Sequence, residues 1–225
     1  MQYPINQRQM TKKAIIFDLD GVIVDTAKYH YIAWRKISND LGFDFSEKEN
    51  EALKGISRVQ SLEFILQKGT IKLSQPEKDK LLFAKNEHYL SLISHMDETE
   101  LLPGIQQLLP ALHDAKIPFA LGSASKNARR ILNALNLTKL FSAIVDGTDV
   151  SKAKPDPEVF VIAARKICFA SKNCIVIEDS KAGIEAANSV NMISVGIGSN
   201  EVLGKADYVL KDTSELTLDF LKSLM

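Results

Sequence analysis

The stretch Lys13 to Thr26, KAIIFDLDGVIVDT, decides the fold. Residues 14–17 form a short apolar run, which is typical of a strand buried on both faces of a parallel sheet. Asp18 and Asp20 follow at its carboxyl end, where open parallel sheets bind their ligands. Because residues two apart on an extended chain point to the same side, the two carboxylates are predicted to lie together. Gly21 then lets the backbone turn sharply.

Two neighbouring carboxylates repel each other, and either a bound cation or a retained proton relieves that repulsion. Both are useful in catalysis. The plain structural alternative is a capped turn, in which Asp20 and Gly21 end a strand while Asp25 and Thr26 open a helix. The position of the pair, after an apolar strand and before a long helical stretch, favours the functional interpretation.

The rest of the chain divides into a helical block and an alternating block. From Thr26 to about Met96 the apolar residues recur with a helical period, and no strand is indicated. After Leu101–Gly104, strands and helices alternate, which predicts an α/β fold. The expected architecture is a doubly wound parallel sheet, a Rossmann-like core of residues 13–26 and 97–225, with an inserted helical cap domain of residues 27–96. The predicted strands are 14–17, 117–122, 143–146, 174–177, 192–195 and an edge strand at 207–210. The predicted helices are a first one with apolar residues from 29 to 41 that stops at Gly42, and then 47–53, 57–66, 75–94, 127–135, 156–166, 182–190 and 214–224.

Composition excludes several classes of protein. The 225 residues are 45% hydrophobic, enough to bury a core, and the formal net charge of +0 provides no field that attracts nucleic acid or an anionic membrane. No apolar run is long enough to span a bilayer, and the first residues lack the apolar centre of a secretory signal. We therefore expect a cytoplasmic monomer without a nucleic-acid or membrane partner. Cys168 and Cys174 are interpreted as small core hydrophobes, since a disulfide between them would be unusual in a reducing compartment.

Polar residues follow other predicted strands as well. Ser123 and Ala124 offer a hydroxyl and a backbone N–H at a predicted helix start, which suits an anion, although both are also ordinary helix-opening residues. Glu178 and Asp179 follow the strand at 174–177. With Asp18 and Asp20 they place four carboxylates around one crevice, which predicts a site for a hard divalent cation. Mg²⁺ fits best, because it needs few protein ligands beside waters and a phosphate oxygen.

The motif FDLDGVIVDT resembles the first motif of the haloacid dehalogenase-like phosphotransferases, and three later segments resemble their other motifs over nearly the whole chain. The resemblance implies that Asp18 is a nucleophile and that Asp20 is a general acid and base. It also implies that Ser123, the Ala124 amide and Lys154 bind the transferring phosphoryl group. Without the resemblance, Lys154 would be interpreted as a solvated lysine. The implied Mg²⁺ ligands are Asp18, Asp20 through its backbone carbonyl, Glu178 and Asp179.

Three further runs, DTAKYHYIAW, LKGISRVQS and GSASKN, resemble the sugar-phosphate mutases of that family. This implies that Arg58 and Ser61 hold the distal phosphate of a bisphosphorylated sugar, and that His30 acts near Asp20 as the cap closes. Taken alone, Arg58 is a charge on a helix face. The chain departs from the mutase pattern at Arg35 and Gly122, where lysine and alanine are expected. The other implied substrate-binding residues are Thr26, Trp34, Gly55, Ile56, Lys85, Ser125, Lys126 and Asn127, together with Ser123, Ala124 and Lys154.

The resemblance to these mutases implies the Mg²⁺-dependent interconversion of β-glucose 1-phosphate and glucose 6-phosphate, through β-glucose 1,6-bisphosphate and an aspartyl phosphate at Asp18. One alternative is a phosphatase of small sugar phosphates that uses the same nucleophile with water as acceptor. Another is a non-catalytic sugar-phosphate sensor, which the presence of all the core acids and Lys154 disfavours. In each case the partner is a small sugar phosphate.

Overall fold

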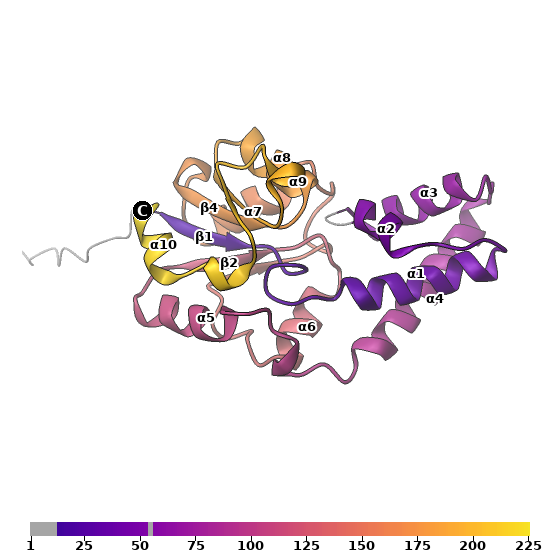
Figure 1. Cartoon of the computed structure of the whole chain (residues 1–225), viewed down its shortest axis with the longest axis horizontal. Coiled ribbons are helices and arrows are strands. Elements are labelled where there is room, and N and C mark those ends of the chain that lie inside the picture. The colour runs from indigo at the N-terminus through magenta and orange to yellow at the C-terminus, as the bar shows by residue number, and fades with distance from the viewer. Residues whose placement is uncertain (1–12, 54–55) are drawn as a thin grey trace, which may run out of the picture.

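The computed structural model describes residues 13–53 and 56–225, in which a six-stranded sheet carries helices on both faces and a helical extension at one end (Figure 1). The strands lie in the order β3-β2-β1-β4-β5-β6, and every neighbouring pair is parallel. The predicted doubly wound sheet and its edge strand are confirmed. The strands are β1 (Ala14–Phe17), β2 (Phe119–Gly122), β3 (Ala143–Val145), β4 (Cys174–Glu178), β5 (Ile193–Ile197) and β6 (Tyr208–Leu210).

Strand β1 lies at the centre of the sheet and is buried on both faces. Ile15 and Phe17 pack into one apolar cluster, while Ala14 and Ile16 pack into a second. Successive side chains of a strand point to opposite faces, so one continuous apolar run serves both layers. The first layer contains α5 (Ile105–Asp114), α6 (Ala128–Ala134) and α10 (Leu218–Ser223), and the second contains α7 (Glu158–Lys166) and α8 (Lys181–Ser189).

Four helices lie between β1 and α5 in the sequence and form the extension in Figure 1. They have an apolar cluster of their own, built around Trp34, Phe45 and Ile65. Serine capping boxes begin three of them, since the hydroxyl and a glutamate or glutamine three residues later satisfy free N–H groups. The helices are α1 (Ala27–Asp40), α2 (Glu47–Asn50), α3 (Arg58–Lys68) and α4 (Gln75–Ile93).

This packing supports our proposal that residues 27–96 form a cap on a core of residues 13–26 and 97–225. The two connections lie side by side: Val24 forms an antiparallel bridge with Leu101, and the Leu102 N–H donates to the Ile23 carbonyl at 3.0 Å. The division is not sharp, because Tyr89 at the foot of α4 packs into a core cluster. From here on, cap and core denote these two segments.

The structure differs from the prediction in several details. Helix α5 and the short α9 (Asn200–Leu203) were not predicted. The chain does not enter a helix at Ser123, since residues 123–127 form a loop before α6. Cys168 is exposed at a left-handed position (φ 63°) just after α7, so its interpretation as a core residue is wrong, whereas Cys174 is buried in β4. Short 3₁₀ turns occupy Glu51–Leu53, Glu98–Glu100, Ser171–Asn173 and Thr213–Glu215.

None of the helices in residues 13–53 and 56–225 combines the length and the apolar character that a bilayer-spanning helix needs.

Candidate active site

A cleft of about 540 Å³ lies between the carboxyl ends of the strands and the cap. The loop after β1 enters it through a tight turn, in which Gly21 has φ 77° and its N–H donates to the Val24 carbonyl at 2.7 Å. Asp18 and Asp20 both line the cleft, as predicted from their spacing. A positive φ favours glycine at position 21, and a β-carbon there would lie 2.1 Å from Asp179 Oδ2. Gly21 thus lets two strand ends bring their acids together.

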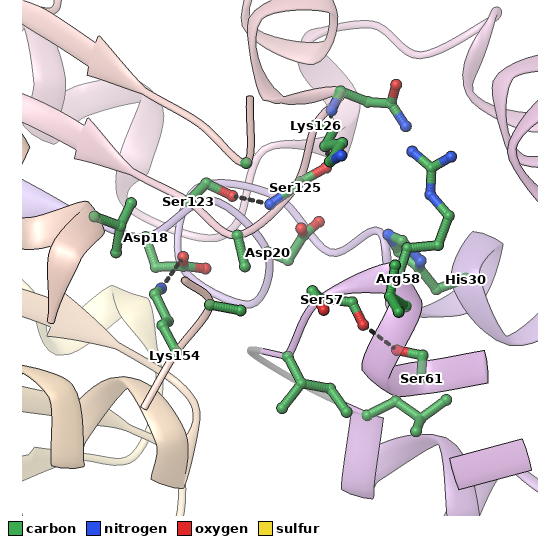
Figure 2. A pocket seen from close by; sticks show the side chains of 18 of the residues that line it. Asp18, Asp20, His30, Ser57, Arg58, Ser61, Ser123, Ser125, Lys126 and Lys154 are labelled. Atoms are coloured by element: carbon green, nitrogen blue, oxygen red, sulfur yellow. Dashed lines mark hydrogen bonds and ion pairs between the residues drawn. The ribbon is translucent and has the colours of Figure 1, made fainter. Parts of the chain in front are cut away.

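Lys154 joins two of the acids. Its Nζ lies 2.5 Å from Asp18 Oδ1 and 2.6 Å from Glu178 Oε1, and all three side chains are buried (Figure 2 draws the Asp18 contact). Burial alone would lower the pKa of Lys154, but the charges of Asp18 and Glu178 outweigh it and the net shift is upward. Burial raises the pKa of Asp18 to about 7, against the opposing charge of Lys154. The lysine therefore stays charged beside a carboxylate from which water is largely excluded.

Glu178 is held on both of its oxygens. Oε1 accepts from Lys154, and Oε2 accepts from the Ser180 N–H at 2.7 Å and the Ser180 hydroxyl at 2.8 Å. A β-carbon on Gly183 would lie 1.9 Å from Oε1, so α8 packs directly on this carboxylate. Glu178 does not line the cleft, whereas Asp179 does. In this arrangement Glu178 serves as a buried anchor for Lys154.

The side chains that line the cleft offer oxygen donors, which a hard cation prefers. Within the described ranges, no three His, Cys, Asp or Glu side chains are arranged to hold a metal ion. The cleft-lining acids are Asp18, Asp20 and Asp179, all oxygen donors at one end of the sheet. Mg²⁺ keeps several waters and shares substrate phosphate oxygens, so one or two protein carboxylates are sufficient. The donor set therefore fits Mg²⁺ better than a metal that requires a full protein cage.

The loop of residues 123–127 is a second polar wall of the cleft. The buried Ser123 accepts at Oγ from the Ser125 N–H at 3.1 Å, and Ser125 Oγ accepts from the Asn127 N–H at 3.2 Å. Because Ser123 Oγ uses only its acceptor capacity in this bond, its own proton remains available to an anion. Ala124 and Lys126 also line the cleft. Loop geometry, and not the predicted helix start, arranges these groups.

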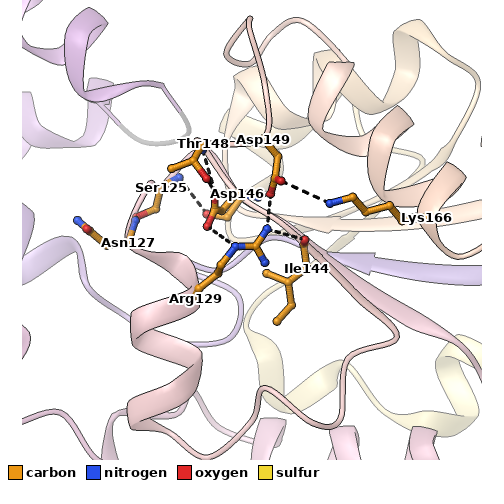
Figure 3. Close-up of polar contacts among 9 residues, drawn as sticks. Ser125, Asn127, Arg129, Ile144, Asp146, Thr148, Asp149 and Lys166 are labelled. Carbon is orange, nitrogen blue, oxygen red and sulfur yellow. Dashed lines mark hydrogen bonds and ion pairs between the residues drawn. The ribbon is translucent and has the colours of Figure 1, made fainter.

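A network behind this loop was not found from the sequence (Figure 3). Arg129 bridges Asp146 and Asp149, with Nε 3.1 Å from Asp146 Oδ2 and Nη2 2.5 Å from Asp149 Oδ2. Asp146 also accepts from the Thr148 N–H at 2.8 Å, which fixes the turn after β3. The following Gly147 N–H donates to the Ser125 carbonyl at 3.2 Å. The turn signal Asp-Gly-Thr-Asp after a strand could have indicated this support.

We predict that Gly147→Ala weakens anion binding in the cleft. The added β-carbon would lie 2.4 Å from the Ala124 carbonyl oxygen, a backbone atom that can move only with the loop. Overpacking of this kind costs about 1–3 kcal/mol of stability, and a loop displaced by about 1 Å can cost roughly 100-fold in a positioned interaction. Calorimetric titration with inorganic phosphate should show binding about tenfold to 100-fold weaker.

Gly42→Ala is the control for that variant. No atom lies within 4 Å of a β-carbon added at Gly42, which has φ 90° in the cap, so the change strains the backbone without touching the loop. It should reduce stability and leave phosphate affinity unchanged. Unchanged affinity in Gly147→Ala as well would show that the turn after β3 does not position the loop.

On the cap side, Arg58 begins α3 and lines the cleft. Burial lowers its pKa, yet an arginine stays charged in proteins. It forms no ion pair within residues 13–53 and 56–225. Figure 2 shows it extending from α3 toward the loop that carries Ser125 and Lys126. Ser61 also lines the cleft, but its hydroxyl donates to the Ser57 carbonyl at 3.1 Å, so an exchange of partner is needed before it can bind a ligand.

Asp20 is bonded by Thr26 and feels the charge of Lys85, around which other cap residues gather. Thr26 donates from Oγ1 to Asp20 Oδ1, and burial raises the pKa of Asp20. Lys85 Nζ lies 2.7 Å from His30 Nδ1 and above the rings of Trp34 and Tyr89. Burial, followed by the charge of Arg58, lowers the pKa of Lys85 well below its usual value. Burial, followed by the charge of Lys85, likewise lowers the pKa of His30. Burial therefore favours the neutral form of His30.

The structure brings most of the predicted residues into one cleft. Thr26 and Glu178 do not line the cleft, and Gly55 lies outside the described residues. Lining residues that the sequence did not single out include Asn50, Leu53, Val59, Leu82 and Gly147. The predicted residues that line it are Asp18, Asp20, His30, Trp34, Ile56, Arg58, Ser61, Lys85, Ser123, Ala124, Ser125, Lys126, Asn127, Lys154 and Asp179.

Comparison with known proteins gives consistent matches. Residues 15–197 match the family model of the haloacid dehalogenase-like hydrolases. The chain is 46% identical to a β-phosphoglucomutase of Bacillus subtilis, over 93% of each chain. It is 27% identical to a phosphorylated carbohydrates phosphatase of Thermotoga maritima, over 95% of this chain and all of that protein. The crystal structure of a β-phosphoglucomutase from Clostridium difficile superimposes with a TM-score of 0.90 at 45% identity, covering 94% of this chain and 96% of that one.

Proposed function

The chain belongs to the haloacid dehalogenase-like hydrolase family, and on that premise we propose that its cleft transfers a phosphoryl group through Asp18. The activity is that of a β-phosphoglucomutase, which interconverts β-D-glucose 1-phosphate and glucose 6-phosphate. One observation supports the mutase assignment in particular. The core wall holds Lys154 beside Asp18, and the cap wall presents Arg58, which has no ion-pair partner among residues 13–53 and 56–225. A substrate with a phosphate at each end needs two such cationic walls, whereas a phosphatase needs only the first.

In the proposed reaction Asp18 attacks the phosphorus of β-glucose 1,6-bisphosphate, and the bond between phosphorus and the sugar oxygen breaks. Asp20 donates a proton to the departing oxygen. Glucose 6-phosphate leaves, and in the second half β-glucose 1-phosphate gives its 6-hydroxyl proton to Asp20 and attacks the aspartyl phosphate, which regenerates the bisphosphate. Burial, which raises the pKa of Asp20, suits it to hold that proton between the two halves. Lys154 and the Ser123 hydroxyl offset charge on the transferring oxygens.

Metal dependence is a property of this family. We propose Mg²⁺, held by the carboxylates of Asp18 and Asp179 and by the backbone carbonyl of Asp20. When bound, the ion would neutralise charge on the transferring phosphoryl oxygens. Glu178 remains a predicted ligand, but direct ligation would require one of its oxygens to exchange Lys154 or Ser180 for the ion.

Parallel assays of two products test the activity. With β-glucose 1-phosphate, Mg²⁺ and a catalytic amount of the bisphosphate, glucose 6-phosphate should accumulate in proportion to substrate consumed. The α anomer should not be consumed. If inorganic phosphate is released instead and no glucose 6-phosphate forms, the protein is a sugar-phosphate phosphatase, like the relative from Thermotoga maritima.

We predict that Asp20→Asn lowers kcat by about 100-fold to 10,000-fold and leaves KM nearly unchanged, because the variant keeps its backbone carbonyl and loses only a proton carrier. Phosphorylation of Asp18 by acetyl phosphate should fall far less, since acetate leaves without needing a proton. Steady-state kinetics and a phosphorylation time course measure the two effects. A change confined to KM would contradict the general acid and base assignment.

A further inference from the structure

A buried amide oxygen in the wall of the cleft has no partner. Asn50 is the last residue of α2 and is only 5% exposed, although the three residues before it in the helix are charged and lie nearer the solvent. Its Nδ2 donates to the Ala27 carbonyl at 3.4 Å, a long bond. Its Oδ1 accepts no hydrogen bond within the described part of the chain. Among the unpartnered buried polar atoms found there, it alone belongs to a residue that lines the cleft.

Burial by itself does not explain an asparagine at this position. A buried carbonyl oxygen without a donor costs free energy, and nearly all such groups in native proteins are satisfied. The cap residues that line the same cleft include the apolar Leu53, Ile56 and Trp34. A leucine would fill a similar volume there without an unsatisfied atom. A hydrogen-bond donor on a bound ligand would satisfy the Asn50 oxygen.

The position of Asn50 suggests which ligand group is involved. The residue bonds Ala27, which directly follows Thr26, and Thr26 donates to Asp20. Asn50 therefore lies at the start of α1, beside the segment that holds the proton carrier. An amide oxygen has no charge and accepts only from donors, so it suits a hydroxyl and not a phosphate.

We propose that Asn50 is a substrate-orienting residue, whose side-chain oxygen accepts a hydrogen bond from one ring hydroxyl of the bound sugar. The proposal rests on the proposed function in so far as the ligand is a sugar phosphate. By fixing one hydroxyl at the cap wall, Asn50 would set which face of the ring and which oxygen are presented to Asp20.

Calorimetric binding of glucose 6-phosphate to the full-length protein in Mg²⁺ tests the proposal without requiring turnover. Wild type and Asn50→Leu are compared on glucose 6-phosphate and on the four analogues that each lack one ring hydroxyl. Asn39→Leu is the control, since Asn39 is exposed on α1 of the same cap. Asn50→Leu should bind glucose 6-phosphate about tenfold to 100-fold more weakly. One analogue should bind wild type and Asn50→Leu equally, and that analogue identifies the hydroxyl.

Other outcomes overturn the proposal. Equal affinity of Asn50→Leu and wild type for glucose 6-phosphate would show that the oxygen contacts no ligand. A loss of similar size for the sugar and all four analogues would make Asn50 a structural bridge between α2 and α1. If wild type binds the sugar phosphates but does not interconvert them, the mutase assignment fails while the comparison of analogues still decides the role of Asn50. If wild type binds no sugar phosphate, both proposals fail.

Discussion

Asp18→Asn is expected to abolish turnover, with a loss of at least roughly 10,000-fold. An amide nitrogen or oxygen cannot attack phosphorus at a useful rate, and the substitution also removes a charge that would hold Mg²⁺. The folded state should survive, because the asparagine oxygen can still accept from Lys154, whose other partner is Glu178. Steady-state assays of glucose 6-phosphate formation measure the loss. Incubation with acetyl phosphate followed by intact mass measurement should show no phosphorylated protein.

Asp25→Asn provides the control for Asp18→Asn. Asp25 lies in the same loop and loses the same charge on substitution, but it is exposed and its Oδ1 only caps the Ala27 N–H at 3.0 Å, a bond that asparagine can keep. It should retain nearly full activity. Turnover of Asp18→Asn within tenfold of wild type would refute the nucleophile assignment and leave the family's first motif as a structural turn in this chain.

The sheet could be predicted because buried parallel strands carry their signal locally. Residues 14–17 and 174–177 are continuous apolar runs that end in acids, and both runs became neighbouring strands with their acids at one edge. The same reasoning gave the end of each strand to within one or two residues. Helix α5 was missed because Pro110 lies inside it and interrupts the helical pattern, although its apolar residues pack against the core.

The sequence predicted where the site lies, but not which of its side chains contact one another. The reach of Lys154 across to Asp18 and Glu178 depends on contacts over 136 and 24 residues, which no local pattern encodes. The same holds for Glu178, whose oxygens prove to be occupied by Lys154 and Ser180. Gly122, which departs from the expected alanine, also acquires a reason in space: an added β-carbon would lie 2.9 Å from Phe160, and the ring of Phe160 lies under Lys154.

Arg58→Ala is the second variant with a large expected effect, and it separates a mutase from a phosphatase. In the mutase cycle the bisphosphate binds in two orientations, so the phosphate away from Asp18 always lies against the cap. Arg58 lines the cleft there, partly buried and without an ion pair in the described residues. Loss of such a charge-assisted contact costs about 2–4 kcal/mol, or roughly 30-fold to 1000-fold in rate when the contact is used in the transition state. Coupled assays of glucose 6-phosphate formation should show that loss.

Two further measurements decide what Arg58 contributes. Arg58→Lys should recover only part of the activity, because a point charge cannot reproduce a two-pronged phosphate contact. Arg35→Ala is the control, since Arg35 is exposed on α1 and pairs with Asp44 at 3.2 Å, and its kinetics should match wild type. Acetyl phosphate needs no distal anchor, so Arg58→Ala should still phosphorylate Asp18. If mutase turnover is intact in Arg58→Ala, Arg58 does not bind the distal phosphate, and the result favours the phosphatase alternative. If phosphorylation by acetyl phosphate is lost as well, Arg58 supports the core chemistry or the fold. A residue that binds only the distal phosphate would leave the phosphorylation of Asp18 by a small donor unchanged.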